Sequence, residues 1–204
     1  MNSQEPTLNL DEKRLPLTVF TLAWPVVLQE ATWVILSLVI IFFIGHLGPA
    51  AITAVGLSET IVSLPAIALA GLTVGVTAIV ARHVGARESE QANIAVRQSM
   101  LMVFILGIVL AIILWFSADE LLWVFRAQQE VIELGRDYIR VNAPATISVF
   151  VLYCSAAILR ASGDTKTPMI IMIIVEVIGV VLAYILINGF GGAPALGVLG
   201  AGIA

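Results

Sequence analysis

The chain has 204 residues, of which 60% are hydrophobic and 12% are charged, and its mean hydropathy is +1.05. A typical soluble domain is about 45–50% apolar and about 25% charged, so this composition excludes an ordinary soluble globule. The net charge of −4 and the ten basic residues also exclude a nucleic-acid surface, which needs a row of cations along the phosphates.

Residues 1–14 are polar and precede an apolar stretch that is longer than the roughly 7–15 apolar residues of a signal peptide. We interpret them as a cytoplasmic lead-in. The single cysteine, Cys154, has no partner in the chain for a disulfide or for a cysteine-based metal site. We interpret it as a small packing residue of a membrane helix.

Five long apolar stretches follow the lead-in, each close to or above the roughly 20 residues that a helix needs to cross the hydrocarbon core. In lipid every backbone polar group needs a partner within the protein, which favours helices, and the alternation of barrel strands is absent. The sequence therefore predicts an all-α membrane protein. The expected helices lie at about 15–44, 52–81, 94–118, 136–159 and 167–188, and a truncated sixth lies at 196–204.

The positions of lysine and arginine between these stretches predict the orientation, because cytoplasmic loops carry the excess of both. With the N-terminus in the cytoplasm, seven basic residues fall on the inner side and three on the outer side. The inner set is Lys13, Arg14, Arg82, Arg87, Arg97, Arg160 and Lys166, and the outer set is Arg126, Arg136 and Arg140. We therefore expect a multi-pass protein of the bacterial inner membrane with a cytoplasmic N-terminus.

The polar segment LRASGDTKTP, residues 159–168, then becomes the cytoplasmic turn between the fourth and fifth helices. Gly163 and Asp164 suit a tight turn, and Pro168 suits the first turn of the next helix. Arg160 and Asp164 are expected to shape or anchor this turn.

Four segments in a fixed order resemble the multidrug and toxic compound extrusion (MATE) family of efflux transporters. They are FFIGHLGPAAITAVGL at 42–57, VARHVGARESEQA at 80–92, ILRASGDTKTPM at 158–169 and GAPALGVLGAGIA at 192–204. The resemblance implies a bundle of twelve helices in two lobes, of which residues 15–204 supply the first. It also implies export of bulky, often cationic organic compounds in exchange for protons or sodium ions.

The chain departs from the family at three positions. Family members often have aspartate five residues before the glycine of the Gly-x-Leu-Gly turn, where this chain has Ile40. Many also have asparagine or aspartate at two places in the fifth helix, where this chain has Gly179 and Ala183. The usual cation site is therefore missing from these positions.

Two other acids lie deep in apolar stretches and are our candidates for ion coupling. Glu30 is about 15 residues into the first helix and Glu176 about nine into the fifth, which corresponds to about 14 to 22 Å along each helix. Ionisable residues at this depth are costly and usually face a cavity or the interior of the bundle. We predict that Glu30 and Glu176 share a depth near the middle of the membrane and exchange protons there.

Three neighbours are expected to line a cavity with these acids. Gln29 adjoins Glu30, Asn142 lies in the fourth helix, and Trp33 follows Glu30 by three residues on the same helix face. A cationic substrate would compete with protons for the same negative charge. The expected partners are this substrate, the lipid bilayer and the second lobe, with a proton or sodium ion for coupling and no metal or other cofactor.

Three alternatives stay open. A membrane-embedded enzyme is disfavoured because the sequence has no metal-ligand cluster, nucleophile elbow or phosphate-binding glycine loop. A flippase for lipid-linked intermediates, in a related fold, would need several cations in the cavity, whereas arginine and lysine avoid the apolar stretches. The third alternative is an inactive half-transporter fragment.

Overall fold

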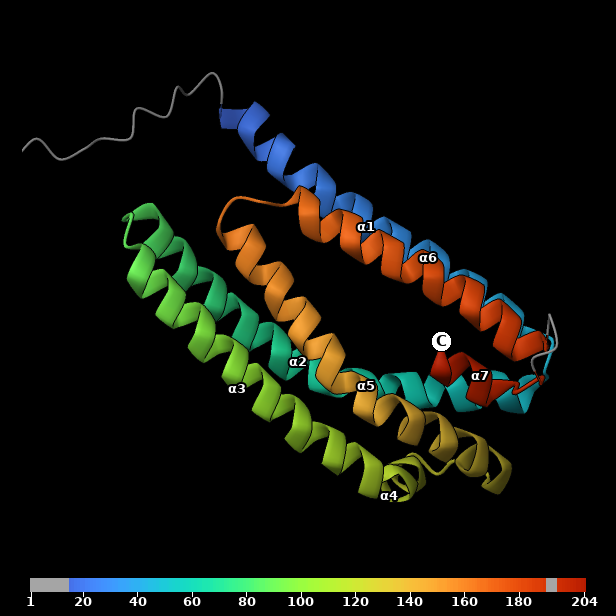
Figure 1. Ribbon diagram of the computed structural model, residues 1–204. Helices are drawn as coiled ribbons and strands as arrows, with labels where there is room; N and C mark the ends of the chain where they lie inside the picture. The colour runs from blue at the N-terminus through green and yellow to red at the C-terminus, as the bar shows by residue number, and fades with distance from the viewer. Residues whose placement is uncertain (1–14, 190–193) are drawn as a thin grey trace, which may run out of the picture.

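The computed structural model describes residues 15–189 and 194–204, and this part of the chain is helical throughout apart from its turns (Figure 1). The helices are α1 (Leu15–Gly45), α2 (Pro49–Gly85), α3 (Ser89–Phe116), α4 (Ala118–Val124), α5 (Gln129–Ala161), α6 (Lys166–Asn188) and α7 (Val198–Ile203). All except α4 and α7 are long and apolar enough to cross a membrane. The predicted all-α membrane fold is confirmed.

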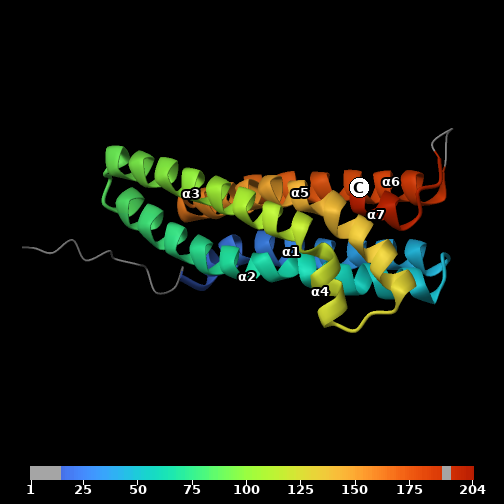
Figure 2. The same ribbon diagram turned by 90° about the horizontal axis from the view of Figure 1, so that it is seen from below.

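The long helices form two groups. α1 packs along α6, whereas α2 and α3 pack on α5 (Figures 1 and 2). The short α7 contacts α5 and α6. We name the ends of the bundle after the predicted orientation: the inner end holds the turn at 162–165, and the outer end holds the turn at 46–48.

Buried side chains join the two groups of helices at the outer end. One cluster includes Ile44 of α1, Val55 of α2, Tyr138 of α5, Ile187 of α6 and Val198 of α7. The other two clusters contain buried residues of α2, α3, α4 and α5 only. The α1 and α6 pair is therefore held to the rest of the bundle mainly near the outer end, which leaves space between the groups farther in.

Small residues allow α5 to approach its neighbours closely. The Ser58 hydroxyl of α2 donates a hydrogen bond to the Gly135 carbonyl of α5 over 3.2 Å, and a β-carbon on Gly135 would lie 2.7 Å from that hydroxyl oxygen. A β-carbon on Gly107 of α3 would lie 3.1 Å from the α-carbon of Ile147. Close backbone approach at small residues is the usual way in which membrane helices gain packing energy.

The helix boundaries differ from the sequence prediction most between 116 and 136. α3 ends at Phe116, and a separate short helix, α4, follows the bend at Ser117. Two acids occupy the first turn of α4, where they interact favourably with the helix dipole. α5 begins at Gln129 rather than at 136, because its polar first turns are also helical. The lead-in at 1–14 lies outside the described residues.

The turn at 162–165 has the geometry expected for a tight connection. Gly163 has a φ of 93°, which favours glycine, and its amide donates to the Arg160 carbonyl over 3.0 Å. The Asp164 carboxylate accepts hydrogen bonds from the backbone amides of Lys166 and Thr167 over 3.1 and 3.0 Å. Pro168 is buried in the first turn of α6.

Candidate functional site

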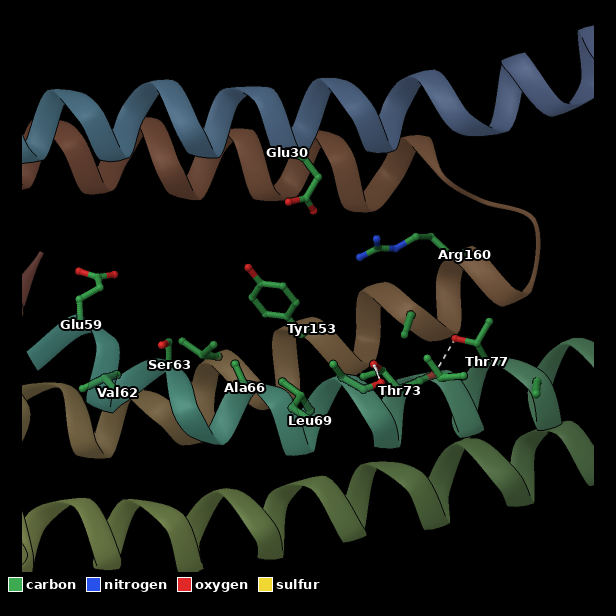
Figure 3. Close-up of a pocket in the computed structure, with 15 residues that line it drawn as sticks. Glu30, Glu59, Val62, Ser63, Ala66, Leu69, Thr73, Thr77, Tyr153 and Arg160 are labelled. Atoms are coloured by element: carbon green, nitrogen blue, oxygen red, sulfur yellow. Dashed lines mark hydrogen bonds between the residues drawn. The ribbon is translucent and has the colours of Figure 1, made fainter. Parts of the chain in front are cut away.

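A cavity of about 800 Å³ lies between α1, α2 and α5 (Figure 3). Most of its wall comes from α2, whose lining residues recur at three- and four-residue spacing and therefore share one helix face. These residues are Glu59, Val62, Ser63, Ala66, Leu69, Ala70, Thr73, Val74, Thr77 and Ala78. The wall is thus largely apolar, with a few polar groups, as is typical of sites for organic molecules.

Glu30 reaches into this cavity from α1 (Figure 3). Its carboxyl lies close enough to the Glu176 carboxyl of α6 for the two to interact electrostatically, and both interact with the Tyr153 hydroxyl of α5. Glu176 itself does not line the cavity. Its Oε2 atom is buried and has no hydrogen-bond partner. The structure therefore brings together the two acids that the sequence singled out, one on the cavity and one behind it.

Arg160 lines the inner part of the cavity, although the sequence suggested a role in the turn (Figure 3). Its Nε atom donates to the Ala156 carbonyl over 3.2 Å, which holds the guanidinium group against α5. The arginine also interacts electrostatically with Tyr153. The inner part of the cavity therefore combines the Glu30 carboxyl group with a guanidinium group.

Glu59 of α2 lines the cavity on the other side of Tyr153, toward the outer end (Figure 3). Its Oε2 atom accepts a hydrogen bond from the Tyr138 hydroxyl of α5 over 3.1 Å. Tyr138 is buried in the cluster that joins the helix groups, so this bond links a cavity carboxylate to the core of the bundle.

The three expected neighbours do not line this cavity. Gln29 is buried, and Trp33 is half exposed on α1. The Asn142 amide donates to the Tyr138 carbonyl over 3.0 Å, and a β-carbon on Gly202 of α7 would lie 3.2 Å from its Nδ2 atom. Asn142 therefore lies against α7.

Sequence reasoning gave little weight to Glu59, Tyr153 and Arg160 as cavity residues. One signal was available in α2, where Glu59, Ser63, Thr73 and Thr77 recur at multiples of a helical turn. Tyr153 and Arg160 gave no comparable signal, because their placement depends on which face of α5 is left uncovered by α2 and α3.

Comparisons with known proteins agree on the family. The sequence profile of the MatE family matches residues 25–185. A probable multidrug resistance protein NorM from Oceanobacillus iheyensis is 30% identical over 134 residues, which cover 66% of this chain and 30% of that protein. A probable NorM from Thermotoga maritima is 28% identical over 163 residues, which cover 79% of this chain and 35% of that protein.

Solved structures show the same arrangement of helices. An outward-facing multidrug resistance MATE transporter of the MOP superfamily superposes with a TM-score of 0.84 at 28% identity, covering 91% of this chain and 40% of that one. A MOP superfamily transporter from Pyrococcus furiosus, described as having a binding pocket of reverse polarity, has a TM-score of 0.83 at 28% identity, covering 91% of this chain and 40% of that one. An inward-facing MATE structure gives a TM-score of 0.72 at 30% identity, covering 82% of this chain and 37% of that one.

The chain spans 30% to 40% of the length of these relatives and solved transporters. Its helices correspond to one lobe of the two-lobe transporter fold. The match to the family profile extends over most of the chain and agrees with the apolar helices and with the ordered segments of the sequence. The chain therefore belongs to the MatE family of multi-pass membrane transporters.

Proposed function

We propose that this chain forms the first lobe of an antiporter that exports bulky organic compounds, with Glu30 and Glu176 coupling export to the entry of a proton or sodium ion. The multidrug resistance names of the relatives support the export function. The single observation that supports the coupling role is the proximity of the two carboxyl groups at the cavity between α1, α2 and α5.

The placement of the two acids suits an exchange mechanism. Glu30 is accessible from the cavity, whereas the Oε2 atom of Glu176 is buried without a partner. Two neighbouring carboxylates repel each other, so a cation or proton bound near the pair relieves this repulsion. An organic cation and the coupling ion therefore compete for the same negative charge, and this competition links their movements.

The charge of the cavity favours export of organic compounds over flipping of lipid-linked intermediates. The lining residues include two glutamates and one arginine, Arg160. A carrier of a lipid pyrophosphate would need several cations to balance its negative charge.

The first prediction concerns dye efflux from cells that express the protein, with Glu30→Gln and Glu176→Gln as test variants. Because each change removes a titratable group but keeps a similar shape, we expect efflux to lose most of its dependence on external pH. If sodium is the coupling ion, the same variants lose their dependence on external sodium at fixed pH.

Glu90→Gln is the matched control, since Glu90 is an exposed acid in the first turn of α3. It should behave as the wild type. Efflux that keeps the wild-type response to pH and to sodium in both test variants would exclude coupling through these two acids.

A further inference from the structure

The cavity holds a carboxylate that the coupling mechanism does not use. Glu59 projects from α2 into the cavity, and only its Oε2 atom is engaged, by the Tyr138 hydroxyl at 3.1 Å (Figure 3). The hydrogen bond fixes the carboxylate at the cavity wall and leaves Oε1 for another partner. Within the described residues, no basic side chain forms an ion pair with Glu59.

Glu59 lies apart from the pair at Glu30 and Glu176, on a third helix and on the other side of Tyr153 (Figure 3). Tyr138 interacts with Glu59, whereas Tyr153 interacts with Glu30 and Glu176. Glu30 lies 15 residues before the outer end of α1 at Gly45, and Glu59 lies ten residues after the start of α2 at Pro49. At about 1.5 Å per residue, the two carboxylates differ in depth by about 7 Å, in addition to the width of the cavity that separates α1 from α2.

The wall between the two carboxylates is largely apolar. Val62, Ala66 and Leu69 of α2 and Val149 of α5 line it, and Ser63 turns its hydroxyl to the Thr60 carbonyl of its own helix. The Tyr153 hydroxyl is the polar group that points into the cavity here (Figure 3). Such a wall offers few hydrogen bonds to the middle of a ligand and favours an alkyl or aryl segment there. The cavity thus has a negative group near each end of an apolar passage.

We propose that Glu59, held by Tyr138, is a second binding site for a positively charged group, so that the cavity takes elongated dications with one charge at Glu30 and the other at Glu59. This inference rests on the proposed export function and specifies a substrate class for it. Arg160 lines the inner end of the cavity and repels positive charge. It therefore limits how far toward the inner end the dication can bind.

The test compares two probes that share a ten-carbon chain. Decamethonium carries a trimethylammonium group at each end of a ten-carbon chain, and (10-hydroxydecyl)trimethylammonium carries a hydroxyl in place of one of them. Isothermal titration calorimetry with the protein in lipid nanodiscs, corrected for empty nanodiscs, gives both affinities. We expect the wild type to bind decamethonium at least about tenfold more tightly, because one partly solvated charge contact is worth that much.

Glu59→Gln should lower the affinity ratio of the two probes to less than about twofold and change the affinity for the single cation little. Glu130→Gln is the control, because it removes the same charge at a residue outside the cavity. Glu130 is exposed at the start of α5 and does not line the cavity. It should keep the wild-type ratio. A wild-type ratio in Glu59→Gln would overturn the proposal and leave Glu59 as a structural partner of Tyr138.

A second variant guards against loss of folding in Glu59→Gln. Ser63 follows Glu59 by one helical turn and lines the same cavity, so Ser63→Glu in the Glu59→Gln background returns a carboxylate to this wall. We expect it to restore most of the preference for decamethonium. No restoration by a folded double variant would also count against the site.

The calorimetric experiment has no ion gradient and therefore does not depend on coupling. A normal preference for decamethonium together with unaltered pH dependence in Glu30→Gln and Glu176→Gln would refute only the coupling role. Lost coupling in those variants, with no preference for decamethonium in the wild type, would refute only the second binding site.

Discussion

Asp164 shows how a single side chain fixes the start of a membrane helix. Its Oδ1 atom accepts hydrogen bonds from two backbone amides in the first turn of α6, which have no acceptor within the helix. Hydrogen bonds from Thr167 hold the pKa of Asp164 below its ordinary value. The Thr167 side chain contributes most, followed by its backbone amide. The charged form is therefore the one that stabilises the folded turn.

The second prediction follows from the sign of this shift. Because the pKa is lowered in the folded protein, the stabilisation is present above the ordinary aspartate pKa of about 3.9 and is lost as the pH falls through the lowered value. We expect Asp164→Ala to lower the melting temperature at pH 7, and the difference from the wild type to narrow below about pH 4. Circular dichroism melts at pH 7, 5 and 3 measure this difference.

Asp164→Asn is the control, since it keeps an acceptor oxygen and loses the charge. It should retain more of the wild-type melting temperature than Asp164→Ala. Equal melting temperatures for the wild type and Asp164→Ala at pH 7 would show that the turn does not depend on this side chain.

At the scale of elements, the contact between α3 and α5 depends on the absence of a side chain at Gly107. The glycine is buried, and the nearest atom to an added β-carbon is the α-carbon of Ile147, which belongs to the backbone of α5. A backbone cannot move aside as a flexible side chain does. Larger residues at Gly107 therefore have to push the two helices apart.

The third prediction is that Gly107→Val lowers the free energy of unfolding by about 1–3 kcal/mol, the usual cost of overpacking. Unfolding in sodium dodecyl sulfate, followed by circular dichroism, provides the measurement. Gly75→Val in α2 is the matched control, because it adds the same side chain to a long helix at a position with no neighbour within 4 Å. The prediction fails if the two variants are equally stable.

At the scale of the whole molecule, the two groups of helices meet at the outer end and leave the cavity between them farther in. The orientation of this arrangement in the membrane decides from which side a compound enters. The bias of lysine and arginine predicts that the turn at 162–165 lies in the cytoplasm. Arg160 and Glu30 are then nearer the cytoplasmic side than Glu59.

The fourth prediction tests this orientation with single cysteines in a Cys154→Ala background. Ser162 and Gln128 are both exposed, in the inner turn and in the connection before α5. We expect a membrane-impermeant maleimide to label Gln128→Cys in intact cells and Ser162→Cys only after permeabilisation. The opposite pattern would invert the topology, and buried Cys154 should stay unlabelled in the parent chain.

The sequence alone was sufficient for the class of fold and for the family, because both depend on features that are local along the chain. Apolar stretches of membrane length require helices, and the ordered segments around 42–57 and 158–169 carry the family pattern. Counting residues also gives the positions of Glu30 and Glu176 along their helices, and their shared depth in the membrane stays a prediction. The separate helix α4 was not predicted, because it has only seven residues, two of them acids, and so lacks the length and composition of a membrane-crossing stretch.

Only the tertiary structure decided which side chains share the cavity. Gln29 and Trp33 flank Glu30 in the sequence but do not line the cavity, whereas Glu59 and Arg160 line it from two other helices. Periodicity shows which residues share a helix face, but the rotation of each helix is set by contacts such as those at Gly107 and Gly135. The sequence by itself therefore determined that the chain forms helices of membrane length and where its acids fall along them, and the packing of α2 and α5 determined which charges face one another.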